Sequence, residues 1–142
     1  MLKRPEIHGN TIVVPSDPNL IGEIDEFVES RLRARKVDDS IIADIAICAT
    51  EIANNGIIHG NKANPEKTVK LDMNFTGEEV TITITDQGQY FNPDDVENPL
   101  DEKNLLREVG RGIFIVRSLM DRLEITPAEG GGTMVTLVKK IT

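Results

Sequence analysis

Two polar side chains four residues apart, Glu51 and Asn55, are the first candidates for chemistry in this sequence. Residues at this spacing lie on one face of a helix, one turn from each other. A carboxylate can take up a proton, and a carboxamide oxygen can bind a metal ion such as Mg²⁺. The same pair also fits the solvated side of an ordinary amphipathic helix, which Asn54 and His59 would share. The segments around the pair therefore have to decide between the two interpretations.

The pair lies in residues 41–61, which are predicted to form one long helix. Apolar residues recur there at the three- and four-residue spacing of a buried stripe, namely Ile41, Ile45, Ala49, Ile52 and Ala53. Cys48 falls beside this stripe and is expected to be a small core residue. Asp38, Asp39 and Ser40 would cap the first turn, and Gly60 would end the helix.

Composition excludes several classes of protein. A chain of 142 residues is expected to form one domain, 1–142. Its net charge of −8 argues against a nucleic-acid surface, because phosphate binding needs clustered Lys and Arg. The single cysteine excludes an internal disulfide. We see no signal peptide and no segment approaching membrane-spanning length, so the expected compartment is the cytoplasm.

The other elements predict an α+β fold, a two-layer sandwich with helices on one face of a mixed, mostly antiparallel sheet. Residues 11–14 read as an edge strand, which could pair with a second copy of the chain. Asp17-Pro18 should start a helix that runs to about residue 35. Two alternating strand pairs follow, at 69–75 with 80–84 and at 123–125 with 134–138.

Glycines accompany three further candidate sites. Asp86 follows a strand, where its carboxylate can accept a hydrogen bond from an exocyclic amine while Gly88 admits a flat ring. Residues 110–112, Gly-Arg-Gly, are predicted to open a helix whose free amides would bind phosphate. Thr133 begins the last strand and could add a hydroxyl and an amide. Taken singly, each site also has an ordinary structural interpretation. The segment at Asp86 could be a plain turn, residues 110–112 a flexible hinge, and Thr133 the exit of a hairpin turn.

Between these sites, residues 89–109 lose periodicity and are predicted to be a long loop with a functional or mobile role. Other chemistries find no support in the sequence. It contains neither a P-loop nor a strand–GxGxxG–helix unit, and no serine lies in a nucleophile-elbow context. His8 and His59 are too few and too far apart for a metal cluster.

In combination, the motifs resemble those of the Bergerat-fold ATP-binding domains of gyrases, chaperones and histidine kinases. Within that superfamily the chain looks like the bacterial anti-sigma-factor serine/threonine kinases. The resemblance covers residues 15–140 and rests on the segments TEIANNGIIHGN, TDQGQYFNP, GRGIFIVRSLMD and GGGT. It implies one histidine-kinase-like ATP-binding domain with ATP and Mg²⁺ as cofactors.

The resemblance also implies roles for single residues. Glu51 matches the general base, Asn55 the magnesium-binding asparagine, and Asp86 with Gly88 the adenine site. The start of the third motif matches the phosphate-binding segment, with residues Gly110, Arg111, Gly112 and Ile113. Thr133 matches the residue whose hydroxyl lies near the nucleotide. Residues 89–109 correspond to a mobile lid whose closure would exclude water. Tyr90 stands where the family commonly has a second glycine, so it would restrict the backbone if a positive φ were needed there.

The implied function is that of an ATP-dependent serine/threonine kinase acting as an anti-sigma factor. Such a protein forms a homodimer, holds a sigma factor inactive and phosphorylates a STAS-type antagonist of the anti-sigma factor. Two alternatives stay open: a non-catalytic ATP-binding module for partner switching, and the ATP-binding domain of a histidine kinase. Phosphate transfer to an antagonist would distinguish the kinase from the non-catalytic module. Against the second, we expect no dimerisation helix with a phospho-acceptor histidine before the domain.

Overall fold

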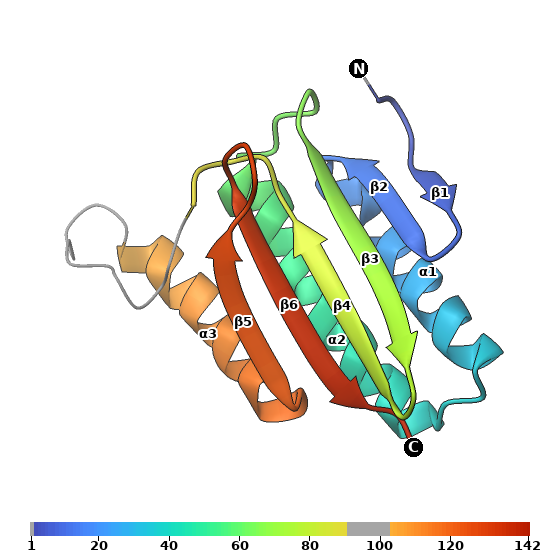
Figure 1. Cartoon of the computed structure of the whole chain (residues 1–142). Coiled ribbons are helices and arrows are strands. Elements are labelled where there is room, and N and C mark those ends of the chain that lie inside the picture. The colour runs from blue at the N-terminus through green and yellow to red at the C-terminus, as the bar shows by residue number, and fades with distance from the viewer. Residues whose placement is uncertain (1, 91–102) are drawn as a thin grey trace.

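A six-stranded antiparallel sheet carries helices on one of its faces (Figure 1). The computed structural model describes residues 2–90 and 103–142, apart from the side chains of residues 103–108. The strand order is β1-β2-β3-β4-β6-β5, and every pairing between these strands is antiparallel. The predicted α+β sandwich is confirmed, although the described strands include no parallel pair of the kind expected in a mixed sheet.

The elements follow one another along the chain almost as the sequence predicts. They are β1 (Glu6–His8), β2 (Thr11–Pro15), a 3₁₀ turn (Pro18–Leu20), α1 (Ile21–Ala34), α2 (Asp39–Asn55) with a π turn (Gly56–Gly60), β3 (Thr68–Thr76), β4 (Glu79–Thr85), α3 (Lys103–Leu119), β5 (Arg122–Pro127) and β6 (Thr133–Lys140). The long helix predicted over residues 41–61 is therefore α2 together with its π turn.

The core lies between the sheet and the helices because apolar and polar residues alternate along the strands. In β4, Val80, Ile82 and Ile84 are buried, and the threonines between them face the other side. The central helix α2 buries Ile42, Ile45, Ala46, Cys48, Ala49, Ile52 and Ala53. Each fully buried large aliphatic side chain contributes about 1.5–3 kcal/mol. This packing fixes the position of α2 and of the polar side chains near its end.

One helical stretch, Asp39–Gly60, is 22 residues long, and its most apolar window of 18 residues has a mean hydropathy of 1.5. Length and composition alone would let it cross a membrane, so the expectation that no segment approaches that length is wrong. Half of its most apolar window is buried inside the fold. Its apolar character is accounted for by its place as the central helix against the sheet.

Strand β2 is not at the edge of the sheet, so the prediction of an edge strand at residues 11–14 is wrong. It pairs with β1 on one side and with β3 on the other. The three residues of β1 are all exposed, so no burial pattern in the sequence announces them. A tight turn at Gly9, with φ of 59°, folds β1 back onto β2 and makes β1 the edge.

Helix α3 begins at Lys103, seven residues before Gly110. Two predictions are therefore wrong: residues 110–112 do not open the helix, and residues 103–109 are helical rather than loop. The remainder of the predicted loop, 91–102, lies outside the described residues. Buried apolar residues recur from before the glycines onward, at Val109, Ile113 and Val116 in the helix and at Met120 directly after it. This stripe carries the helix through both glycines, at roughly 1 kcal/mol each relative to alanine.

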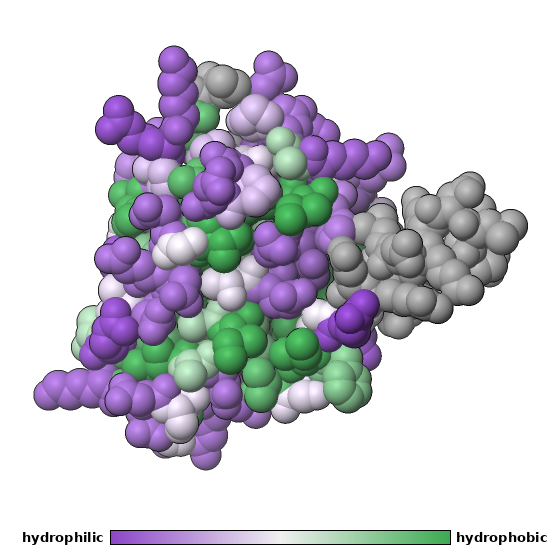
Figure 2. Space-filling view, turned by 180° about the vertical axis from the view of Figure 1, so that it is seen from behind, coloured by the Kyte–Doolittle hydropathy of each residue, from purple (hydrophilic) through white to green (hydrophobic). Residues whose placement is uncertain are grey.

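The helix side of the molecule is mostly polar, with apolar patches between the polar side chains (Figure 2). Among the described side chains, large apolar residues stay exposed at Ile47 on α2, at Ile58 on its π turn, and at Phe114 and Ile115 on α3. The described chain therefore leaves part of the α2 and α3 surface uncovered by its own side chains.

Candidate functional site

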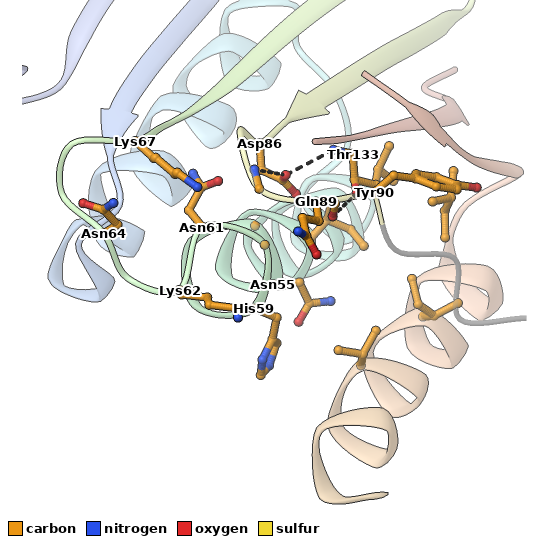
Figure 3. A pocket seen from close by; sticks show the side chains of 18 residues that line it. Asn55, His59, Asn61, Lys62, Asn64, Lys67, Asp86, Gln89, Tyr90 and Thr133 are labelled. Atoms are coloured by element: carbon orange, nitrogen blue, oxygen red, sulfur yellow. Dashed lines mark hydrogen bonds between the residues drawn. The ribbon is translucent and has the colours of Figure 1, made fainter. Parts of the chain in front are cut away.

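A cavity of about 430 Å³ opens at the C-terminal end of α2, a volume ordinary for a small-molecule site (Figure 3). Five of the residues predicted for the site line it, namely Asn55, Asp86, Gly88, Ile113 and Thr133. They come from α2, the turn after β4, α3 and the start of β6, which the sheet pairing and the helix packing bring together. Glu51, Gly110, Arg111 and Gly112 are not among the lining residues.

Asp86 is held rigidly at the floor of the cavity. Its Oδ1 accepts hydrogen bonds from the backbone N–H of Gly88 at 3.0 Å and of Thr133 at 3.1 Å. The residue is only 8% exposed, and this burial raises the pKa of its carboxyl group, against the opposing effect of the two amides and of Lys67. No described residue donates to Oδ2. As far as the described residues go, that oxygen is therefore the acceptor of Asp86 that a bound molecule could use.

Glycines surround Asp86 where any side chain would collide with it. A Cβ on Gly60 would lie 2.5 Å from Asp86 Oδ2, and one on Gly132 would overlap the Asp86 carbonyl. A Cβ on Gly88 would overlap the carbonyl of Gly60. Gly132 also has a φ of 88°, which favours glycine. The backbone therefore closes tightly around this carboxylate, and Gly60 does more than end the helix.

The two residues of the predicted pair on α2, Glu51 and Asn55, lie in different surroundings. Asn55 lines the cavity, whereas Glu51, one turn earlier, faces α3. A Cβ on Gly112 would overlap Glu51 Oε1, so the missing side chain at Gly112 is what lets the carboxylate approach α3. The shared helix face is present, but α3 covers its Glu51 end in this conformation.

The predicted phosphate site is not preformed. Gly110 and Arg111 are exposed on α3, inside the helix rather than at its start. Amides in a helix interior bond to the carbonyls of the preceding turn, so they are not free to bind an anion. Ile113 alone from this motif lines the cavity.

Tyr90 lines the cavity and is 40% exposed. The described non-glycine residues with positive φ are Lys36, Lys62 and Ala63, and Tyr90 is not one of them. The tyrosine therefore causes no left-handed strain at the position where the family has glycine. Next to it, the Gln89 carbonyl accepts a hydrogen bond of 3.5 Å from Thr133 Oγ1.

Sequence reasoning missed the contribution of the segment after α2. Lys62 and Lys67 bring basic groups to the cavity wall beside His59, and Asn61, which is buried, lines the cavity as well. A π turn occurs at Gly56–Gly60, and such turns are frequent at functional sites. The sequence did not predict it, because a π turn has no clear sequence pattern.

The comparisons with known proteins agree on the family. Residues 14–139 match the family described as histidine kinase-like ATPase domain. The anti-sigma F factor of Bacillus cytotoxicus is 34% identical over 103 residues, which are 71% of this chain and 70% of that protein. The anti-sigma F factor of Clostridium perfringens is 29% identical over 102 residues, 70% of this chain and 73% of the relative.

Among solved structures, the SiaB–SiaC complex from Pseudomonas aeruginosa contains a chain with a TM-score of 0.64 and 19% identity. The match covers 95% of this chain and 89% of that one, and at this identity it supports the fold alone. Because the family match covers nearly the whole chain, the protein belongs to the histidine kinase-like ATPase domain family and groups there with the anti-sigma factors.

Proposed function

We propose that this protein is an ATP-dependent serine/threonine kinase that acts as an anti-sigma factor. Asp86 carries the proposal, because no described residue donates to its Oδ2 and it lines a cavity of nucleotide-binding size. A carboxylate oxygen suits the amino group of adenine and repels the carbonyl of guanine. The glycines around Asp86 let the backbone close tightly on this carboxylate, which fixes its position.

Bound ATP would supply the γ-phosphoryl group and most of the ligands of a Mg²⁺ ion. Asn55 lines the cavity and would add one oxygen to that ion, which commonly keeps water and phosphate ligands and few from the protein. The described residues contain no cluster of three His, Cys, Asp or Glu that would bind a metal by itself. Glu51 would accept the proton of the incoming serine or threonine hydroxyl.

Replacing Asp86 by asparagine is expected to reverse the base preference. The new side-chain oxygen can still accept from the two amides, and the new side-chain nitrogen then donates into the cavity, which suits guanine. Loss of the charged acceptor should weaken ATP binding roughly ten- to hundredfold. Calorimetric titration with ATP and GTP measures this, and an unchanged preference for ATP would remove Asp86 from the adenine site.

The same D86N variant has a pH signature. Because burial raises the pKa of Asp86 in the folded state, the ionised carboxylate costs stability at neutral pH, and the cost disappears as the pH falls through that raised pKa. Without ligand, the variant should therefore have a higher free energy of unfolding than the wild type. The difference should be largest at neutral pH and smallest in acid. Denaturation curves at several pH values test this.

The phosphate end requires a change in α3, and we propose that its helix opens near Gly110 to free amides for the phosphates. Gly110→Ala should strengthen the helical form by about 1 kcal/mol, since a Cβ there meets nothing within 4 Å. We therefore expect roughly fivefold weaker ATP binding together with higher stability to denaturant. Calorimetry and urea unfolding measure the two effects, and ATP binding as tight as in the wild type would mean that α3 stays closed.

For the partners, we propose a sigma factor and a STAS-type antagonist, with the protein as a cytoplasmic homodimer. The names of the anti-sigma F factors support the sigma factor. The SiaB–SiaC structure supports binding of a second protein on this fold. Pairing of two copies through residues 11–14 does not support the homodimer, because β2 is interior to the sheet.

A non-catalytic partner-switching module is the second candidate. The observation in its favour is the position of Glu51, which faces Gly112 of α3 instead of the cavity. If α3 stays in this position when ATP binds, the carboxylate cannot reach a hydroxyl at the γ-phosphate. Phosphate transfer to an antagonist discriminates the two functions.

A further inference from the structure

Asn61 is the most completely buried polar residue beside the cavity, with 1% of its surface exposed. It follows the π turn of α2 and comes before the loop to β3. All its side-chain hydrogen-bonding groups that the structure describes are turned toward neighbouring elements. A buried amide of this kind is costly unless it is satisfied, and this one is.

The Asn61 side chain joins three elements that are distant in the sequence. Its Nδ2 donates to Ser16 Oγ after β2 at 2.8 Å and to the Thr68 carbonyl at the start of β3 at 2.9 Å. Its Oδ1 accepts from the backbone N–H of Gln87 at 2.8 Å. Only a side chain with a donor at one end and an acceptor at the other can make all three bonds.

The third of these bonds reaches the turn that carries Asp86. Gln87 stands between Asp86 and Gly88, and its own Oε1 accepts from the Thr68 N–H at 2.7 Å. The turn is thus held through both the backbone and the side chain of Gln87. Gly88, next along the chain, donates to Asp86 Oδ1. The direction of Asp86 Oδ2 therefore depends on where Asn61 holds Gln87.

We propose that Asn61 is a positioning residue that sets the preference for adenine by fixing the turn of residues 86–88 against the end of α2. The proposal rests on the proposed function, in which Asp86 contacts the base. Asn61 lines the cavity, but both its N–H groups and its Oδ1 already bond to neighbouring elements of the protein, so its effect on the base is indirect, through the turn that carries Asp86. Without its acceptor, the Gln87 amide is released and Asp86 Oδ2 no longer keeps the place that distinguishes an amino group from a carbonyl.

The test is the ratio of ATP to GTP affinity, measured by calorimetric titration of each purified variant. Asn61→Ala is expected to lower this ratio at least about tenfold. Ser16→Ala is the matched control, because it removes one bond of Asn61 but leaves the bond to Gln87. It should reduce the melting temperature and keep the wild-type ratio. A residue with a merely structural role would lower stability in both variants and change the ratio in neither.

A second variant covers the case in which Asn61→Ala does not fold. Gln87→Ala removes the Oε1 bond to Thr68 from the exposed side of the same turn and should lower the ratio about threefold. An unchanged ratio in the folded variants overturns the proposal for Asn61. A wild-type protein without any preference for ATP instead overturns the proposed adenine site, so the two failures are distinguishable.

Discussion

Glu51→Gln is expected to bind ATP as the wild-type protein does and to transfer its phosphate to a purified antagonist at least about 100-fold more slowly. The amide has the shape of the carboxylate and can keep the same place against Gly112, but it cannot accept the hydroxyl proton. Phosphoryl transfer depends mostly on positioning and electrostatics, so loss of a base should change the rate and not the binding. Radiolabel transfer from ATP and calorimetric titration measure the two quantities separately.

Two variants on the same helix serve as controls. Asp44→Asn removes a charge two turns earlier on α2 and should leave both rate and binding unchanged. Asn55→Ala should instead weaken the Mg²⁺-dependent part of ATP binding. Transfer by Glu51→Gln at the wild-type rate would leave Glu51 as an ordinary solvated residue and would favour the non-catalytic module.

Gly60→Ala is expected to weaken ATP binding roughly 100-fold although residue 60 has no unusual backbone angle. The new Cβ would lie 2.5 Å from Asp86 Oδ2 and 2.7 Å from its Cγ. The carboxylate is buried and held by two amides, so it cannot move aside without losing those bonds. Each such charged bond is worth roughly 1.5–3 kcal/mol, which is about ten- to hundredfold or more in affinity.

Gly22→Ala is the matched control for this substitution. Gly22 is also in a helix, α1, but a Cβ there meets nothing within 4 Å. It should raise the free energy of unfolding by up to about 1 kcal/mol and leave ATP binding unchanged. Calorimetric titration and urea denaturation of both variants give the comparison. Wild-type affinity in Gly60→Ala would show that the end of α2 does not constrain Asp86.

Much of the fold could be predicted from the sequence because local periodicity determines it. The alternation in β3 and β4 and the apolar stripe of α2 place those elements within a few residues of their observed bounds. The order of the motifs around Glu51, Asn55, Asp86 and Thr133 was sufficient to identify the family, and the matches to known proteins confirm it.

The sequence predicted poorly where a short or exposed element carries no burial pattern. Strand β1 has three exposed residues, and its pairing is what moves β2 from the edge to the interior. In α3, the glycines at 110 and 112 looked like a helix start, because glycine is rare in a helix interior. The apolar stripe that continues through them outweighs this local preference once it is buried against α2 and the sheet.

Only the tertiary structure determined which groups surround Asp86. The amide of Thr133 comes from 47 residues away, and Asn61 reaches 45 residues back to Ser16 and 26 forward to Gln87. Gly60 and Gly112 are constrained by side chains they approach in space, Asp86 and Glu51, and not by their own backbone angles. The residue types that could do chemistry could be recognised in the sequence because each belongs to a short contiguous motif. Their orientation was not, because it follows from close contacts that the sheet order and the helix packing create.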